Sequence, residues 1–591
     1  MPERKITKVL VANRGEIAIR IFRACFDLGL RTVAMYSNED TLSLFRTRAD
    51  EAYLIGKNKS PLGAYLDIPS IIALAKQHNV DAIHPGYGFL SENADFARAC
   101  EKAGIIFVGP PSDVLGKMGD KLNAKELAIS CGVPVVPGTS VPLRDADEAL
   151  EKALSYGFPV ILKAASGGGG RGMRRCECAE EVKPAFELVR SEAKKAFGND
   201  DIFIEKYIVE PKHIEVQILA DEYGNVYHLG ERDCSLQRRY QKVVEFAPAF
   251  SVPEETRRQL HEDAVKIAKA VGYVNAGTVE FLVDRDGNHY FIEMNPRIQV
   301  EHTVTEMVTG IDIVRAQLLI AGGQPLSCPD IGLKSQDDLH INGYSIQCRV
   351  TTEDPANNFA PDNGKITSYR SGGGFGVRLD GGNAATGTVI SPYYDSLLVK
   401  VTVWDNTFAG ACRKAARSIS EVHIRGVKTN LPFIANILHR PEFVEGRCHT
   451  KFIDNTPALF EFENSKDRAT RVLKYIANIQ VAEPDVERCA FNDPRYPKAE
   501  RQNPPGLRSL LLEKGPEAVR DWILAQKRLL ITDTTMRDAH QSLLSTRMRT
   551  RDMVKAAEGT ADILSDCFSL EMWGGATFDV AYRFLHESPW E

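Results

Sequence analysis

Short continuous runs of apolar residues alternate along the chain with stretches whose apolar positions recur at helical spacing. Residues 8–37, KVLVANRGEIAIRIFRACFDLGLRTVAMYS, contain one such run, then an amphipathic stretch, then a second run. Continuous apolar strands are typical of a parallel sheet that is buried on both faces. A further strand is predicted over Asp81–Pro85, and a helix is expected to begin after it, at Ser91-Glu92. The pattern therefore predicts an α/β fold that binds ligands at the carboxyl ends of its strands.

Alternation of apolar and polar residues around an Asp-Gly pair predicts a β-hairpin later in the chain. Asp286-Gly287 is expected to form a two-residue turn, because glycine adopts positive φ without steric cost. Counting back from that turn pairs Val283 with Tyr290 and Glu280 with Glu293. Two carboxylates directly opposite one another lie about 5 Å apart at Cβ and repel. The pair therefore indicates a divalent cation, and a polar strand face with ordinary surface charges is the alternative.

The same alternation continues past the hairpin. If the strand stays extended through Pro296, one face carries Glu293, Asn295, Arg297, Gln299 and Glu301. Oxygen ligands followed by a cation, an amide and a second carboxylate suit Mg²⁺-nucleotide chemistry on a small anion.

A glycine-rich loop follows an apolar strand in FPVILKAASGGGGRGM. Lys163 lies on the strand, and the glycines at 167–170 and 172 form the loop. Backbone without side chains can close over a polyphosphate and direct N–H donors at its oxygens, while the lysine adds a positive charge. A flexible linker is the alternative. The loop is not a Walker A motif, and no GxGxxG follows the first strand, which argues against a dinucleotide-dependent dehydrogenase.

Charged residues are dense in the strand-like segments that come next. Glu205-Lys206 lies between two apolar runs, as expected of a segment that joins a mobile lid to a core. His213 and Glu215 share a strand face, where a histidine is also common as a structural residue. Four cations follow within eleven positions, which indicates anion binding or a solvated surface: Arg232, Arg238, Arg239 and Lys242.

Composition bounds these interpretations. The 591 residues predict several domains, and 43% hydrophobic and 26% charged residues are ordinary for a soluble protein. A formal net charge of −6 argues against nucleic-acid binding through a general basic surface. The 12 cysteines form no CxxC pair, so we expect reduced thiols in a cytoplasmic protein. We expect neither a membrane span nor a leader segment, because the first strand begins near the start of the chain.

Several motifs occur together in the first 456 residues: KVLVANRGEIA, HPGYGFLSEN, MGDK, LKAASGGGGRGM, ERDCSLQRR, FIEMNPRIQVEHTVTE and PYYDS. In these motifs and their order the segment resembles the biotin carboxylase domain of the ATP-grasp class. The resemblance implies a Rossmann-like N-terminal subdomain, a small lid subdomain and a larger α+β C-terminal subdomain. It also implies cleavage of ATP with bicarbonate to carboxyphosphate, and then carboxylation of a biotin nitrogen. One departure is Tyr240, where the family often has histidine.

The resemblance also implies roles for single residues. Nucleotide contacts are expected from Lys121, Lys163, Gly168, Gly169, Gly170, Glu205, Lys206, His213 and Gln237. Mg²⁺ ligands are expected at Glu280 and Glu293, with Asn295 beside them. Bicarbonate is expected at Lys242, Arg297, Gln299 and the Val300 backbone. Glu301 corresponds to the general base, Arg349 to the residue that stabilises the biotin enolate, and Tyr87 to the residue that packs on the ureido ring.

A second resemblance begins near residue 529. The segments DTTMRDAHQS and SLEMWGGATFDVAYRFL are similar to the opening of the carboxyltransferase barrel of the pyruvate carboxylase family. There, Asp538 corresponds to a ligand of a divalent metal such as Mn²⁺ or Zn²⁺, and Arg537 and Gln541 face the keto acid. Taken alone, Asp538 could equally be a helix N-cap. A complete barrel needs about 250 residues, and the biotin-bearing Met-Lys-Met motif is also missing. We therefore expect a fragment of a longer polypeptide, and the alternative is that the carrier and the barrel come from elsewhere.

The expected organisation has five parts. They are an N-terminal subdomain (1–118), a lid with its linker (119–206), a C-terminal subdomain (207–456), a linker of the allosteric type (457–528) and a truncated TIM barrel (529–591). The resemblance further implies a homodimer through the biotin carboxylase domain, a tetramer of the full-length enzyme, a biotin carrier domain as partner and an acyl-CoA activator. Two alternatives stay open: a biotin carboxylase subunit of an acyl-CoA carboxylase, and a non-catalytic ATP-binding scaffold.

Overall fold

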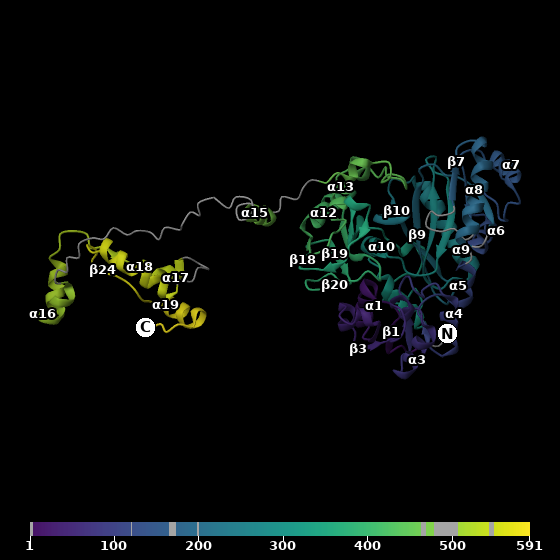
Figure 1. The fold of residues 1–591 in the computed structure, drawn as a ribbon. Helices are drawn as coiled ribbons and strands as arrows, with labels where there is room; N and C mark the ends of the chain where they lie inside the picture. Colours follow the sequence, from purple (N-terminus) through teal and green to yellow (C-terminus); the bar gives the residue numbers. More distant parts are fainter. Residues whose placement is uncertain are drawn as a thin grey trace. The chain divides into compact units, whose positions relative to one another are not determined.

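The computed structural model describes residues 4–119, 121–164, 173–197, 200–462, 468–477, 506–542 and 549–590. The chain divides into two compact units, Met1–Asn464 and Ser465–Glu591 (Figure 1). Within the described ranges, no helix combines the length and the apolar character that crossing a bilayer requires. Cysteines in these ranges carry free thiols, as expected.

The first unit begins with a five-stranded parallel sheet in the order β3-β2-β1-β4-β5. Its strands are β1 (Lys8–Val11), β2 (Arg31–Tyr36), β3 (Glu51–Leu54), β4 (Ala82–His84) and β5 (Ile106–Phe107). Helices α1 (Gly15–Asp27), α3 (Ile68–Gln77) and α4 (Ala94–Lys102) connect them (Figure 1, purple). The α/β prediction is confirmed for this part of the chain.

The helix expected at Ser91-Glu92 begins three residues later than predicted. Helix α4 starts at Ala94, and Asn93 is its N-cap, because the Asn93 side chain accepts a hydrogen bond of 2.8 Å from the Phe96 N–H. Ser91 and Glu92 therefore belong to the loop after β4.

A small antiparallel sheet forms the next part, in the order β7-β6-β8. It consists of β6 (Val160–Ala164), β7 (Met173–Cys176) and β8 (Ile202–Lys206), with α7 (Ala146–Tyr156) and α8 (Ala179–Phe197). Val160, Leu162 and Ile204 are fully buried in the core that these helices share with the sheet. Alternation then places Lys163 and Glu205 on the other face of the sheet.

The largest sheet has eight strands in the order β13-β12-β9-β10-β11-β14-β21-β19, all antiparallel to their neighbours. The strands are β9 (Lys212–Ala220), β10 (Val226–Arg238), β11 (Gln241–Ala247), β12 (Asn275–Val283), β13 (His289–Asn295), β14 (Tyr344–Thr351), β19 (Val377–Gly381) and β21 (Leu397–Asp405). Helix α9 (Glu254–Val271) packs on β9 and β10, α12 (Phe408–Glu421) packs on β14 and β21, and α10 (His302–Thr309) contacts β10, β14 and β21 (Figure 1, teal and green).

The hairpin of β12 and β13 differs from its prediction in two ways that cancel. The turn is longer than two residues, because the Asp284 carboxylate accepts hydrogen bonds from the N–H groups of Asp286 (3.0 Å) and Asn288 (2.9 Å). Val283 therefore pairs with His289, and the predicted pairing with Tyr290 is wrong. A register shift after Phe281 restores the expected pairing further along, so that Glu280 lies opposite Glu293.

The second unit contains short elements. Helix α15 (Arg468–Ala477) comes first, followed by α16 (Leu507–Leu524), in which the non-helical backbone of Gly515 (φ 78°) before Pro516 separates two helices. Strands β23 (Thr532–Asp533) and β24 (Ser569–Leu570) pair in parallel, with α17 (Thr535–Ser542) and α18 (Thr550–Ile563) between them in the chain. A parallel strand pair joined through helices is compatible with the start of a βα barrel, and the barrel stays a prediction.

Candidate active site

The site lies on one face of the large sheet, and strand alternation decides which side chains it receives. In β9, Ile214 and Val216 are buried in the core formed with α9. The period of two therefore turns His213 and Glu215 to the opposite face. Strand β12 follows the same rule, with Val279 toward α9 and Glu280 away from it.

Register across the strands then aligns four charged residues. Glu280 pairs with Glu293 on one side and with Glu215 on the other, and Glu215 in turn pairs with Arg232. The result is a row of three carboxylates that ends in a guanidinium. Glu215, Glu280 and Arg232 are all buried, so their charges must be balanced within the protein.

Lys242 is the central cation of this row. Its Nζ forms an ion pair with Glu215 and lies 3.2 Å from Glu280 Oε1 and 2.7 Å from Glu301 Oε1. Burial would lower the pKa of Lys242, but Glu215, Glu280 and Glu301 raise it well above the usual value. Burial likewise favours the neutral form of Glu215, yet Lys242 and its other partners lower the pKa of Glu215 to about 2. The cluster is therefore fully ionised at neutral pH.

Arg232 closes the row as a completely buried cation. Its guanidinium pairs with Glu215 Oε2 at 3.2 Å and donates hydrogen bonds to Gln217 (2.7 Å), Thr305 (3.1 Å) and Thr278 (3.1 Å). The sequence singled out both Arg232 and Glu215 but assigned neither to the site. Only the pairing of β9 with β10 brings them together, and the dense cations of ERDCSLQRR were the signal that could have indicated it.

His213 lies among the carboxylates. Its Nε2 is 3.0 Å from Glu280 Oε2 and 3.4 Å from Glu215 Oε1. Burial alone would lower the pKa of the imidazole, but Glu280 and Glu215 raise it to about 9. His213 is thus a third positive charge on this face, next to the row of acids.

Asn295, Arg297 and Gln299 lie together, as the alternation predicts. The extended strand on which that prediction was based does not continue past Asn295. Strand β13 ends at Asn295, and the Arg297 N–H donates to the Asn295 carbonyl oxygen at 2.9 Å in a tight turn. The Arg297 guanidinium bridges Asn295 Oδ1 and Gln299 Oε1, each at 3.0 Å. Both amides then donate to Glu280 Oε1, at 2.9 and 3.0 Å. Arg297 also pairs with Glu92 from the loop after β4.

Glu301 is held between two cations. Its Oε1 faces Lys242, and its Oε2 lies 2.9 Å from an Nη of Arg349 on β14. Burial and Glu215 act to raise the pKa of Glu301, but Lys242 and Arg349 outweigh them and keep it below the usual value. Arg349 is shared with Glu245, whose pKa burial raises to about 6.

Tyr87 is connected to this cluster through Glu16 and Lys400. The Tyr87 hydroxyl donates to Glu16 Oε2 at 2.6 Å, and Lys400 Nζ lies 2.9 Å from Glu16 Oε1. Lys400 also donates to the Val300 carbonyl oxygen at 3.0 Å, which directs that carbonyl toward Lys400. Asn13 fixes the loop of Tyr87 by donating to its carbonyl oxygen at 2.8 Å.

The nucleotide residues expected from the sequence are divided between two environments. Lys163 pairs with Glu205 on the open face of the lid sheet, and Lys125 lies 3.5 Å from the same carboxylate. Lys206 and Gln237 are turned to backbone carbonyls, of Gly157 and Phe158 for the lysine and of Cys234 for the glutamine. The Lys121 side chain and the glycines Gly168, Gly169 and Gly170 lie outside the described residues.

The donor set on this face fits a hard divalent cation. Glu280 and Glu293 are opposite one another on paired strands, and carboxylate oxygens are the ligands that Mg²⁺ prefers. Glu280 and Glu215 also bring carboxylate oxygens within 4.8 Å of each other, whereas His213, which is protonated beside them, does not supply a ligand. The Asn295 amide nitrogen donates to Glu280, and the Asn295 amide oxygen accepts a hydrogen bond from Arg297.

The charged residues of the second unit are more exposed. Arg537 pairs with Glu571 Oε2 at 3.0 Å, and its Nη lies 4.0 Å from Asp538 Oδ1. Asp538 lies in the first turn of α17, where its N–H donates to the Thr534 carbonyl oxygen, so it is not the N-cap. The Gln541 side chain lies outside the described residues.

Comparison with known protein families agrees with this architecture. Three family models match: "Biotin carboxylase, N-terminal domain" over residues 5–115, "Carbamoyl-phosphate synthase L chain, ATP binding domain" over 120–328, and "Biotin carboxylase C-terminal domain" over 347–455. The pyruvate carboxylase of Bacillus subtilis is 55% identical over 597 residues, covering 100% of this chain and 52% of that protein. The chain spans about half the length of the curated relatives it matches.

Two solved structures extend the comparison. The biotin carboxylase domain dimer of the Hydrogenobacter thermophilus 2-oxoglutarate carboxylase, in complex with MgADP, ADP and bicarbonate, is 48% identical with a TM-score of 0.72. It matches 78% of this chain and 100% of its own. The pyruvate carboxylase T882A of Rhizobium etli, with the allosteric activator acetyl coenzyme A, is 49% identical with a TM-score of 0.74 over 99% of this chain and 53% of its own. The chain belongs to the biotin carboxylase family.

Proposed function

We propose that this chain uses ATP, Mg²⁺ and bicarbonate to carboxylate biotin, as the first half-reaction of a pyruvate carboxylase. The observation that carries this proposal is Glu301, a buried carboxylate with a cation on each oxygen, next to the acidic row of Glu215 and Glu280. The relatives reported above, which include a structure with MgADP and bicarbonate, support the same assignment.

Glu301 acts as the general base on bicarbonate. Its two cations, Lys242 and Arg349, keep it ionised before the anion arrives. A bicarbonate bound at Lys242 and Arg297 brings a second negative charge close to Glu301, and a like charge raises the pKa of a carboxylate. Binding of the substrate thus raises the pKa of Glu301 toward the range where it accepts a proton. Lys242 and Arg297 hold the anion in position.

The nucleotide lies between the lid and the large sheet. Lys163 and Lys121 hold its phosphates, the loop with Gly168, Gly169 and Gly170 closes over them, and Glu205, Lys206, His213 and Gln237 contact the nucleotide from the lid strand and the core. Glu280 and Glu293, with Asn295 beside them, hold Mg²⁺, which neutralises phosphate charge when bound. Lys163 is free to exchange its present partner Glu205 for a phosphate, because that ion pair is partly exposed.

Biotin binds where Arg349 and Tyr87 approach the same cluster, with Gln299 and the Val300 backbone on the bicarbonate side. The Arg349 guanidinium stabilises the negative charge that develops on the ureido oxygen as the nitrogen loses its proton. Tyr87 packs on the ureido ring, and its hydrogen bond to Glu16 fixes its orientation.

The rest of the enzyme follows from the same proposal. We take pyruvate as the final acceptor, because the similarity to pyruvate carboxylases extends through residues 529–591. Asp538 then holds a divalent metal, Arg537 and Gln541 face the keto acid, and oxaloacetate is the product, as in gluconeogenesis. This proposal includes the five-part division at residues 118, 206, 456 and 528. It also includes a homodimer, a tetramer of the full-length enzyme, a biotin carrier domain, an acyl-CoA activator and a cytoplasmic location.

The test is ATP cleavage by the purified chain with bicarbonate and free biotin, each omitted in turn. Cleavage should require bicarbonate and increase with biotin. Tight ATP binding without cleavage would favour the non-catalytic scaffold. An acyl-CoA carboxylase subunit would cleave ATP in the same way, and only carboxyl transfer to pyruvate by the full-length protein separates it from the proposal.

Glu301→Gln should abolish bicarbonate-dependent cleavage, because the amide cannot accept the proton, and leave ADP binding nearly unchanged. Glu262→Gln, on the exposed side of α9, is the matched control and should keep full activity. If Glu301→Gln also loses ADP binding, the residue is structural and its role as base is wrong.

Glu293→Gln should shift the Mg²⁺ dependence of ATP cleavage to higher concentration, since one of two opposed carboxylates is lost. An unchanged Mg²⁺ titration in this variant would contradict the paired-carboxylate site.

A further inference from the structure

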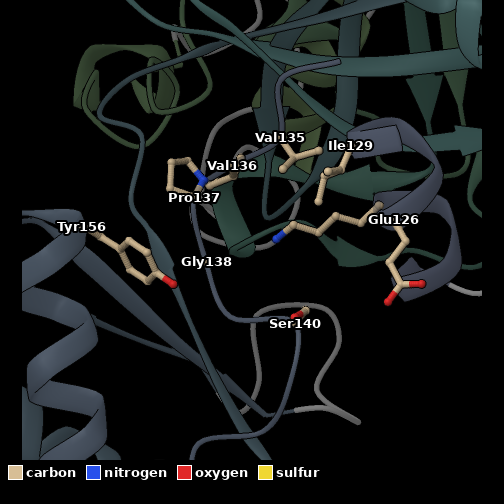
Figure 2. A pocket seen from close by; sticks show the side chains of 9 residues that line it. Glu126, Ile129, Val135, Val136, Pro137, Gly138, Ser140 and Tyr156 are labelled. Carbon is tan, nitrogen blue, oxygen red and sulfur yellow. The ribbon is translucent and has the colours of Figure 1, made fainter. Parts of the chain in front are cut away.

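A cavity of about 290 Å³ lies at the base of the lid (Figure 2). Its walls come from helix α6 (Lys121–Ser130), the segment that follows it, and the end of α7. Ile129, Val135, Val136 and Pro137 give it an apolar lining, and Tyr156 brings a phenol from the lid. The residues proposed above to contact the nucleotide do not belong to its lining.

The cavity lies across the junction of two parts that pair with different sheets. On the core side, Val135 bridges to Phe291 of β13, and the Phe291 N–H donates to the Pro134 carbonyl oxygen at 2.8 Å. On the lid side, Gly138 bridges to Glu205 of β8. Val136 is therefore the residue at which the chain passes from the core to the lid, and it lines the cavity.

The lid side of this junction is closely fitted. A side chain at position 138 would meet Glu205, because a Cβ built there lies 2.7 Å from Glu205 Cγ. The Lys206 N–H donates to the Pro137 carbonyl oxygen at 2.8 Å, and the Thr139 N–H donates to the Ile204 carbonyl oxygen at 3.0 Å. Movement of the lid must therefore carry Pro137 and Gly138 with it, and the shape of the cavity must change.

Lys125 gives the cavity a positive charge. Its side chain is mostly buried, and Glu205, whose carboxylate lies 3.5 Å from the ammonium, is also the partner of Lys163. Two lysines share one carboxylate, so the cluster has an excess of positive charge. Glu126 is exposed at the rim, where water screens its carboxylate. Hydroxyls of Ser140 and Tyr156 offer further hydrogen bonds.

We propose that this cavity binds a small amphiphilic monocarboxylate, which joins core and lid and thereby changes the affinity of the chain for nucleotide. The carboxylate pairs with Lys125, and the apolar body fills the space between Ile129, Val136 and Tyr156. A ligand that contacts both sides of a hinge favours the lid position in which both contacts are made. Because such coupling is reciprocal, nucleotide must change the affinity for the monocarboxylate by the same factor. This second part depends on the nucleotide site proposed above, whereas binding of the monocarboxylate does not.

The experiment titrates the purified chain with 4-fluorophenylacetate and follows the fluorine resonance of the probe by NMR. Its uncharged analogue, 4-fluorophenylacetamide, is titrated in parallel. We expect millimolar affinity for the carboxylate, as is usual for a fragment of this size, and at least about tenfold weaker binding of the amide, because the charge-assisted hydrogen bond is lost.

Two variants locate the site. Lys125→Met removes the cation and should weaken 4-fluorophenylacetate binding about tenfold, whereas Lys117→Met, on the exposed side of α5 (Ser112–Gly119), should not. Ile129→Glu places a carboxylate at the apolar wall and should weaken binding, while Leu154→Glu, at an exposed position of α7 outside the lining, should not. Circular dichroism of each variant establishes that it is folded.

The ADP dissociation constant, measured by calorimetry with and without 4-fluorophenylacetate, tests the coupling. We expect a change of about fivefold, within the usual range for allosteric coupling, which Lys125→Met should remove. No binding of the probe at millimolar concentration, or equal binding by wild type and both site variants, would overturn the site. Probe binding that leaves the ADP dissociation constant unchanged would overturn the coupling. A chain that binds the probe but no ADP would contradict the proposed function and leave the monocarboxylate site standing.

Discussion

The two units contain charged clusters of opposite character. In the first unit, Arg232 is fully buried, the Lys242 side chain is only 12% exposed, and each has several partners with defined geometry. In the second unit, Arg537 and Glu571 form one ion pair in which both side chains are more than 40% exposed. Buried charges must be balanced by the protein because they have lost water, whereas exposed charges are balanced by solvent. The charges of the first cluster are therefore balanced within the protein, whereas water can balance those of the second.

The apolar side chains are likewise buried in the first unit and more exposed in the second. The strands of the large sheet in the first unit contribute fully buried residues to two extended cores. In the second unit, Leu512, Leu529 and Trp590 are each at least 75% exposed. An apolar side chain that stays in water contributes little to stability. We therefore expect the first unit to hold most of the stability of this chain, and the predictions that follow test this difference.

Arg232→Met should give the largest effect. It leaves Glu215 without its guanidinium in a buried environment, and breaking a buried pair costs about 3–5 kcal/mol of unfolding free energy. Urea denaturation of the first unit, followed by circular dichroism, measures the change. Arg258→Met is the matched control, because Arg258 pairs with Glu255 and Glu262 on the exposed side of α9. If both variants unfold at the same urea concentration, burial does not distinguish the charged clusters.

Glu231→Gln tests a buried cluster of the first unit away from the site. Glu231 accepts hydrogen bonds from Arg257 (2.7 Å) and the Ala249 N–H (3.0 Å), and its other oxygen lies 2.6 Å from His261 Nε2. Burial favours the neutral acid, but His261 and Arg257 lower the pKa of Glu231 to about 2. Loss of its charge should cost about 3 kcal/mol of unfolding free energy at neutral pH.

The pH dependence of this difference has a defined sign. A carboxylate whose folded pKa is depressed stabilises the fold above its unfolded pKa, and this contribution is lost as pH falls toward the folded pKa. The gap in unfolding free energy between wild type and Glu231→Gln should thus be constant above about pH 5 and shrink as pH falls from about 4.5 toward 2. Urea denaturation of both proteins at a series of pH values measures it. A gap that grows on acidification would mean that Glu231 is not ionised in the folded protein.

Local patterns in the sequence identified part of the candidate active site, and only the pairing register of the strands in the folded structure identified the rest. Alternation placed Glu280 opposite Glu293 correctly, although the turn was longer than predicted, because the register shift after Phe281 compensated for it. The longer turn depends on the Asp284 side chain, which competes with the strand for backbone donors. The α/β organisation followed from apolar runs, since burial on both faces leaves a clear pattern.

Contacts between distant strands could not be predicted in this way. Arg232 and Glu215 meet because β9 pairs with β10 in one register, and neither residue's own segment specifies that register. Lys206 and Gln237 donate hydrogen bonds to backbone carbonyl oxygens that the sequence did not indicate, and their contact with nucleotide stays a prediction. Side-chain direction depends on which neighbours need a donor, and this is a property of the folded structure.

Arg537→Met should give the smallest effect and completes the comparison. Because Arg537 and Glu571 are both partly exposed, solvent replaces the lost partner, and the free energy of unfolding should change by less than about 1 kcal/mol. Urea denaturation, followed by the fluorescence of Trp573 and Trp590 in the second unit, measures the change, with Arg583→Met as the control for another exposed pair of that unit. A loss as large as that of Arg232→Met would mean that Arg537 is shielded from water in solution. In that case the second unit would contain a buried charged cluster of its own, and the contrast between the two units would reflect which surfaces are covered rather than how each cluster is built.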